Sequence, residues 1–264
     1  MDLLLEAKHT VALTGPWVSR ESGVPDFRTP GKSLWTMVDP IYFTLEGFKS
    51  NPAEFYRLGI KLYRNVQSCS PNATHYALAE LQRRGLVRSI ITQNIDGLHQ
   101  RAGSERVYEV NGNMKSATCL DCGQRVPVEE VSAKLSMGQL PPRCDQCGGL
   151  LRPDVVLFDE GLACYDVVLC QASVGDVVLF DEGLAPDYTE ALNETRAADL
   201  LLIIGAEMGA APANLLPYTV KNMIIINNET SMHDHRARVL IYGSASEAMR
   251  AILEELNSRE GYSA

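Results

Sequence analysis

The amino-acid sequence predicts an α/β fold with a buried parallel sheet and a small inserted metal module. Short apolar, β-branched runs recur along the chain, and residues 199–204 have the composition of a strand buried on both faces. Glycine or short polar side chains follow several of these runs, and open α/β sheets bind ligands at the carboxyl ends of their strands. Two Cys-x-x-Cys pairs, separated by residues 123–143, indicate the inserted module.

The composition is that of an ordinary soluble globular protein. The chain has 264 residues, of which 45% are apolar and 22% charged, and this length fits one large domain or one domain with a small insert. No apolar run reaches the roughly 18 residues of a membrane span, and the acidic start of the chain does not resemble a signal peptide. A net charge of −9 disfavours nucleic acid as a partner and favours basic ones such as lysine-bearing peptides. Seven cysteines without a secretory signal predict a reducing compartment, and we expect the cytoplasm.

The elements follow one another along the chain. Predicted strands span residues 10–14, 87–91, 107–110, 199–204, 221–226 and 238–241. A helix is expected after Asn51, which caps it, with Pro52 at its first position. A second helix opens at residues 71–75 and ends at Gly85, and a third spans about 246–257.

The two cysteine pairs predict a zinc site. The four residues are Cys119, Cys122, Cys144 and Cys147. Their spacing fits a closed tetrahedral site with four thiolate ligands and no open position, and therefore one structural zinc per chain. A thioredoxin-like redox motif is disfavoured, because that motif is a single Cys-x-x-Cys within a βαβ unit. The segment between the pairs is expected to form a small sheet and a loop.

Residues 92–103 read Thr-Gln-Asn-Ile-Asp-Gly-Leu-His-Gln-Arg-Ala-Gly, which resembles the signature of the sirtuins, the NAD-dependent protein-lysine deacylases. Residues 22–28, Ser-Gly-Val-Pro-Asp-Phe-Arg, resemble a second sirtuin motif, and the resemblance covers nearly the whole chain. It implies a Rossmann-like parallel sheet flanked by helices, with an inserted zinc module and a helical module. The expected single catalytic domain, 1–264, has a large part (1–28, 72–114 and 151–264), a helical and cofactor-loop module (29–71) and a zinc module (115–150).

The resemblance also implies site residues. Those expected to bind NAD are Gly15, Ser19, Asp26, Phe27, Arg28, Gln93, Asn94, Ile95, Asp96, Gly205, Glu207, Asn227 and Glu229. Asn94 and Asp96 would also serve catalysis, together with position 111. Residues expected to line the acylated-lysine peptide are Val156, Phe158, Val178, Phe180 and Gly209.

Three departures from the sirtuin pattern bear on activity. Asn111 occupies the position of the catalytic base, which is a histidine in sirtuins; an amide takes no proton at neutral pH, and loss of a general base lowers rates roughly 10²- to 10⁴-fold. Pro16 and Trp17 replace small residues in the first cofactor loop. A positive φ at Trp17 would store about 1 kcal/mol of strain, and its indole is a candidate to fill space that the cofactor needs. Glu207 replaces a hydroxyl and places negative charge near a pyrophosphate.

The segment at 154–163, Asp-Val-Val-Leu-Phe-Asp-Glu-Gly-Leu-Ala, recurs identically at 176–185. The resemblance implies that one such segment pairs with the backbone of the substrate peptide. Two copies are too few for a repeat architecture. We expect only one copy to occupy that position, and the sequence does not identify which.

The sequence therefore predicts a sirtuin-class, NAD-dependent protein-lysine deacylase whose activity is strongly reduced at Asn111. Two alternatives remain open at this point: a non-catalytic module that binds NAD, ADP-ribose or an acylated peptide, and a zinc-stabilised scaffold that binds no nucleotide. His99 is disfavoured as a substitute base, because sirtuins carry this histidine beside their own base. His75 is expected to be structural, and Gly59, three residues after Tyr56, gives no support for binding of acidic acyl groups.

Overall fold

The chain separates into two compact units, which are described one at a time. A computed structural model describes residues 1–25, 38–158, 187–206, 208–209 and 213–261. Unit 1 comprises residues 1–26, 69–110 and 186–264, and unit 2 comprises 27–68 and 111–185. The helical segment after residue 38 and the cysteine-bearing segment therefore belong to the same unit.

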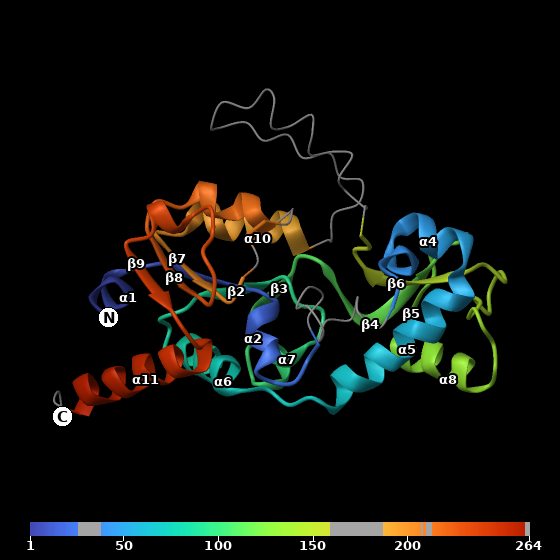
Figure 1. Cartoon of the computed structure of the whole chain (residues 1–264), viewed down its shortest axis with the longest axis horizontal. Helices are drawn as coiled ribbons and strands as arrows, with labels where there is room; N and C mark the ends of the chain where they lie inside the picture. The colour runs from blue at the N-terminus through green and yellow to red at the C-terminus, as the bar shows by residue number, and fades with distance from the viewer. Residues whose placement is uncertain (26–37, 159–186, 207, 210–212, 262–264) are drawn as a thin grey trace, which may run out of the picture. The chain divides into compact units, whose positions relative to one another are not determined.

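Unit 1 contains a six-stranded parallel sheet (Figure 1). Its strands are β1 (Thr10–Thr14), β2 (Ser89–Thr92), β3 (Val107–Glu109), β7 (Leu200–Ile204), β8 (Met223–Asn227) and β9 (Val239–Tyr242). Their order is β3-β2-β1-β7-β8-β9, and each neighbouring pair is parallel. In chain order this is the 3-2-1-4-5-6 arrangement of the doubly wound nucleotide-binding fold. The predicted Rossmann-like sheet is confirmed.

Helices cover both faces of this sheet. They are α1 (Asp2–Glu6), α2 (Pro16–Arg20), α6 (Ala73–Arg83), α7 (Leu98–Arg101), α10 (Asp187–Ala197), η2 (Ala213–Thr219), η3 (Asp234–Arg236) and α11 (Ala245–Gly261). Figure 1 shows α10 on one side of the sheet and α6 and α11 on the other. Alternate residues of β1, β7 and β8 pack with the apolar faces of α6 and α11 in one core cluster. Burial on both faces explains why these strands are continuously apolar.

Unit 2 is built around a three-stranded antiparallel sheet. Its strands are β4 (Gly112–Cys119), β5 (Arg125–Pro127) and β6 (Leu151–Val155), and β4 is central. Its helices are η1 (Pro40–Phe43), α4 (Leu45–Ser50), α5 (Pro52–Ser68) and α8 (Val128–Ser136). Phe43 of η1, Phe48 of α4, and Phe55 and Tyr56 of α5 share one core with the sheet and with two of the cysteines. As predicted, the Asn51 side chain accepts a hydrogen bond from the N–H of Glu54 at the start of α5.

The expectation of a sheet and a loop between the cysteine pairs is only partly correct. A short strand, β5, is present, but residues 128–136 form helix α8. Glu129 and Glu130 lie in the first turn of α8, where negative charge is favourable, and Val131 and Lys134 are buried on one face. Among the described residues, no helix combines the length and apolar character needed to cross a bilayer.

Candidate functional site

The strand order of unit 1 reverses between β1 and β7, and the turns that follow these two strands pack tightly together. The N–H of Gly15 donates to the carbonyl of Ile204, and the N–H of Trp17 donates to the carbonyl of Gly205, at 3.3 and 3.1 Å. A Cβ atom on Gly15 would lie 2.5 Å from the Cα of Ala206. Space, rather than backbone conformation, therefore demands glycine here, since Gly15 has an extended φ of −141°. Nucleotides bind at such a switch point in doubly wound folds.

The unusual residues of the first turn are accommodated without strain. Pro16 is the first residue of α2, where the absence of an N–H leaves no hydrogen bond unmade. Trp17 is helical as well, so the positive φ considered for it is not adopted. The guanidinium of Arg20 lies 4.9 Å from the centre of the Trp17 ring, a cation–π geometry. The altered sequence thus retains an ordered turn.

A buried polar cluster lies beside this turn. The N–H of Gln93 donates to the carbonyl of Thr14 at 2.9 Å, which fixes the residues after β2 against β1. The amide Nδ2 of Asn94 donates to the carbonyl of Gly15 (3.0 Å) and to the Ser19 hydroxyl (2.9 Å). Ser19 in turn donates to Asp96 at 2.6 Å, and Asp96 accepts the N–H of Leu98 at 2.9 Å.

This cluster joins five of the predicted nucleotide residues, Gly15, Ser19, Gln93, Asn94 and Asp96. Gln93, Asn94 and Asp96 are each 8% exposed, whereas Ile95 is half-buried. Burial raises the pKa of Asp96, although the hydrogen bonds from Ser19 and Leu98 oppose the increase. The hydroxyl of Ser19 and the amide of Asn94 have their donors committed within the cluster, so each side chain has a defined orientation.

A second layer of polar side chains supports the cluster, and the sequence did not reveal it. His99 Nε2 lies 2.9 Å from the Thr14 hydroxyl, and the rings of His99 and His75 have centres 4.7 Å apart. Asn72 donates from Nδ2 to the carbonyl of Val18 at 2.7 Å. Separations of 85 residues between Thr14 and His99 and 54 between Val18 and Asn72 leave no local pattern from which to predict these contacts.

The remaining predicted nucleotide residues are not part of the Ser19–Asn94–Asp96 cluster. Asn227, at the end of β8, donates from Nδ2 to the carbonyl of Ala206 at 3.2 Å and is 5% exposed. Glu229 is exposed, as is Gly209, which is predicted to line the acylated-lysine peptide and not the nucleotide. Asp26, Phe27, Arg28 and Glu207 lie outside the described residues, so their predicted roles stay predictions.

Asn111, at the position of the sirtuin base, is held by its backbone in unit 2. Its carbonyl accepts the N–H of Val156 at 2.9 Å. The next residue, Gly112, has φ +76°, and a Cβ there would lie 2.2 Å from the carbonyl oxygen of Asp154. The turn at Asn111 is therefore fixed against the strand that leads to Val156, and the Asn111 side chain is half-buried.

The first copy of the duplicated segment continues β6. Phe158 forms a parallel bridge with Thr44, donating to the carbonyl of Phe43 and accepting from the N–H of Leu45 at 3.1 and 3.2 Å. Its side chain is 45% exposed. The second copy, with Val178 and Phe180, lies outside the described residues.

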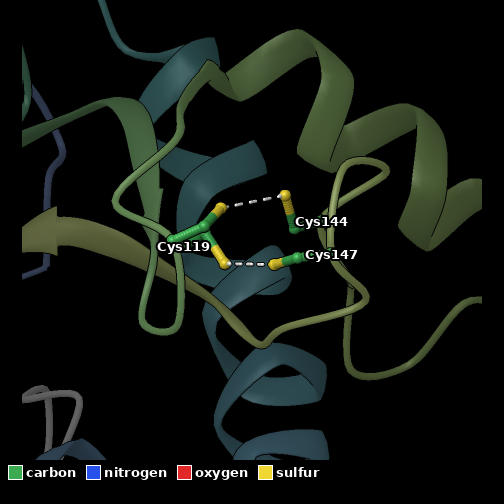
Figure 2. Close-up of side chains that lie close together, drawn as sticks. Cys119, Cys144 and Cys147 are labelled. Carbon is green, nitrogen blue, oxygen red and sulfur yellow. Dashed lines mark hydrogen bonds between the residues drawn. The ribbon is translucent and has the colours of Figure 1, made fainter.

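The four predicted cysteines converge in unit 2. Their Sγ atoms all lie within 4.8 Å of one another, and Figure 2 shows Cys119, Cys144 and Cys147 pointing toward a common centre. The Cys119–Cys147 and Cys122–Cys144 sulfur pairs are 3.5 and 3.8 Å apart. A tetrahedral ion with bonds of about 2.3 Å requires sulfurs about 3.8 Å apart. The cluster therefore fits one zinc ion with four thiolate ligands.

Both cysteine pairs use the same backbone turn. The N–H of Gly123 donates to Cys119, and the N–H of Gly148 donates to Cys144, with φ values of +72° and +77° at the two glycines. Four protein ligands leave no open position, so the site is structural.

Comparisons with known proteins agree with this architecture. Residues 15–174 match the model of the Sir2 family. The NAD-dependent protein deacetylase 2 of Caldanaerobacter subterraneus subsp. tengcongensis is 40% identical over 97% of this chain and 94% of its own length. The NAD-dependent protein deacylase 2 of Archaeoglobus fulgidus is 38% identical, with the same coverage of both chains.

Solved structures lead to the same family. A Sir2 protein bound to an acetylated peptide has a TM-score of 0.81 at 32% identity, and a complex of Sir2 with a p53 peptide and NAD+ has a TM-score of 0.80 at 33% identity. Each comparison covers 97% of this chain and 96% of the other. With a six-stranded sheet in Rossmann order and four converging cysteines in place, these matches establish that the chain belongs to the Sir2 family, the sirtuins.

Proposed function

We propose that this chain is an NAD-dependent protein-lysine deacylase whose turnover is strongly reduced because Asn111 replaces the base. The observation that carries the proposal is the buried Ser19–Asn94–Asp96 cluster at the β1–β7 switch point. Relatives that cover nearly the whole chain are named as NAD-dependent deacetylases and deacylases, which supports the same reaction class.

The residues at the switch point fit a dinucleotide. Gly15 and Gly205 bring backbone close to backbone, and buried polar groups with fixed orientations lie beside them. We assign Gly15, Ser19, Gln93, Asn94, Ile95, Asp96 and Gly205 to the phosphate, ribose and nicotinamide parts of NAD, and Asn227 and Glu229 to adenosine. When bound, NAD supplies an electrophilic ribose carbon and nicotinamide as the leaving group.

The chain's own residues orient the reactants. Asn94 and Gln93 have amide groups that bind the nicotinamide end, and Asp96 accepts hydrogen bonds from hydroxyl or amide donors. Because Asp96 is buried, its hydrogen bonds lie in a medium of low polarity, where they are stronger than in water. These groups position the reacting carbon without taking part in proton transfer.

Asn111 limits the reaction in this proposal. A carboxamide accepts a hydrogen bond from a ribose hydroxyl but cannot remove its proton near pH 7. The expected loss is about 10²- to 10⁴-fold relative to a histidine at the same position.

The proposed substrate is an acylated lysine in a protein or peptide. Solved Sir2 relatives bind an acetylated and a propionylated peptide, and the net charge of −9 suits basic sequences around the lysine. Val156 and Phe158 lie on the segment that we assign to peptide binding. The second candidate, a module that binds NAD or acylated peptide without chemistry, is favoured by the same Asn111, since binding needs no base.

Nicotinamide release from NAD in the presence of an acetyl-lysine peptide tests the proposal. The chain is compared with Asn111→His and with Asn113→His, a matched control two residues further along. We expect turnover to increase about 10²- to 10⁴-fold in Asn111→His only. Equal turnover in the chain as it stands and in Asn111→His would show that the base has been misassigned. Tight peptide or ADP-ribose binding without turnover in any variant would favour the binding module.

A further inference from the structure

We propose that His99 is a positioning residue of the nucleotide site: through Thr14, and with His75 and Asn72, it holds both ends of the β1–α2 turn. This inference deepens the proposed function and rests on it for the identity of the ligand. Thr14 is the last residue of β1 and Val18 lies within α2, so the two contacts described above bracket residues 15–17.

The proposal assigns a direction to each hydrogen bond of this support. The Thr14 hydroxyl lies 3.4 Å from the carbonyl of Ile91 and 2.9 Å from His99 Nε2, and we assign its proton to the carbonyl, which can only accept. Thr14 therefore accepts from His99, whose Nε2 carries the proton and whose Nδ1 is a bare acceptor. In the same way, His75 Nδ1 accepts the N–H of Asn72 at 3.2 Å, so the proton of a neutral His75 lies on Nε2.

These assignments leave a complementary pair of atoms. His75 Nε2 is a donor and His99 Nδ1 is an acceptor, each without a partner among the described residues, and their rings are adjacent. Both side chains are fully buried, at 0 and 1% exposure, where an unmatched donor or acceptor is unfavourable. Each histidine is thus held by its own hydrogen bond, His75 by the N–H of Asn72 and His99 by Thr14, and the two rings are in contact.

Burial keeps both rings neutral. Burial lowers the pKa of His75 to about 4, and Glu21 at the end of α2 only partly opposes it. Burial, and then the neighbouring His75, lower the pKa of His99 well below its usual value. At pH 7 both rings therefore keep one proton each and a fixed tautomer.

The backbone of the β1–α2 turn orients two of the predicted nucleotide residues, Gln93 and Asn94. The carbonyl of Thr14 accepts the N–H of Gln93, and the carbonyl of Gly15 accepts the amide of Asn94. A shift of Thr14 would therefore displace the backbone that orients both amides. Asn72 also donates to the Ser22 hydroxyl at 2.9 Å, which extends the same support to the loop after α2.

Two substitutions of His99 distinguish a role in positioning the nucleotide site from a role in the overall stability of the protein. His99→Gln can place an amide N–H near the position of Nε2 and keep the bond to Thr14, whereas His99→Asn is too short to do so. We expect ADP-ribose affinity to stay within about threefold in His99→Gln and to fall about tenfold in His99→Asn, the size of one lost hydrogen bond. Melting temperatures are measured in parallel. Equal affinity in both variants, whatever their melting temperatures, would overturn the proposal.

Histidine nitrogen NMR of the full chain tests the same proposal without activity or ligand. The expected spectrum shows His75 and His99 as neutral Nε2–H tautomers at pH 7, with amide shifts of Gly15 and Gln93 that move in His99→Asn but not in His99→Gln. An Nδ1–H tautomer or a charged ring at His99 would overturn it. If the chain binds no ADP-ribose, the proposed function fails, and the NMR result still decides whether His99 holds the turn.

Discussion

Replacing Gly15 by alanine should disrupt the nucleotide site more than any other addition of one methyl group. The new Cβ would lie 2.4 Å from Gln93 Oε1, 2.5 Å from the Cα of Ala206 and 2.8 Å from the carbonyl oxygen of Gly205. Carbon atoms pack at about 3.5–4.0 Å, so the turns after β1 and β7 must separate by about 1 Å. Two of the three neighbours are backbone atoms, which cannot rotate away. We expect a loss of about 3 kcal/mol in unfolding free energy, the upper end of the range for overpacking.

The control for this substitution is Gly243→Ala in the same unit. Among the described residues no atom lies within 4 Å of a Cβ built there, and its φ is not in the left-handed region. Urea unfolding and ADP-ribose binding are measured for both variants. The control should stay within about 1 kcal/mol of the parent chain and keep its affinity. If Gly15→Ala matched the control in both measurements, the close approach of β1 and β7 would not be the reason for glycine.

Three further predictions concern the rest of the chain. The core of unit 2 includes Cys119 and Cys144, so removing zinc with a chelator should abolish hydrogen-exchange protection in that unit. The strands β1 and β7 of unit 1 should stay protected. Equal loss of protection in both units would contradict a local role for the metal. Burial depresses the pKa of His75 to about 4 in the folded state, so between pH 6.5 and 4 the unfolded chain binds a proton there that the folded chain does not. The unfolding free energy should therefore be highest above pH 6.5 and decrease by about 1.4 kcal/mol per pH unit as the pH falls toward 4. An unfolding free energy that does not change between pH 6.5 and 5 would refute this. Gly59 lies inside α5, and no atom of the described part of the chain lies within 4 Å of a Cβ built there. Gly59→Ala should therefore raise the free energy of unfolding by about 0.5–1 kcal/mol in denaturant titrations, and a decrease would reveal a packing constraint at this position.

Much of the fold was predictable because unit 1 has strong local signals. The run at 10–14 is β1 without a change in either boundary, and the other predicted strands lie within three residues of the observed ones. Strands are continuously apolar where helices cover both faces of their sheet, so an apolar run in the sequence directly indicates such a buried strand. Helix α8 was missed because its nine residues contain two valines and follow a proline, a composition that fits a strand equally well.

The candidate site was predictable only in part. Short motifs identified Asn94 and Asp96, and paired spacing identified the cysteines, because each set lies close together in the sequence. The contacts of Ser19 with Asp96 and of Thr14 with His99 join residues 77 and 85 positions apart, and only the strand order brings them together. The conformation of Trp17 was also beyond the sequence, since the same residues suit a strained loop or the first turn of a helix.

The strand order also bears on how the protein is synthesised. β1 is central in the sheet, and Thr10 pairs with Leu200, which leaves the ribosome about 190 residues later. Until then, one edge of a strand that is fully buried in the folded sheet has no partner in the nascent chain. Such edges recruit other strands, so this interval favours aggregation, and the six-stranded sheet cannot close before synthesis is nearly complete. Chaperone capture during translation should therefore peak between the emergence of β1 and that of β7, and a ribosome profile of chaperone-bound nascent chains would reveal the window.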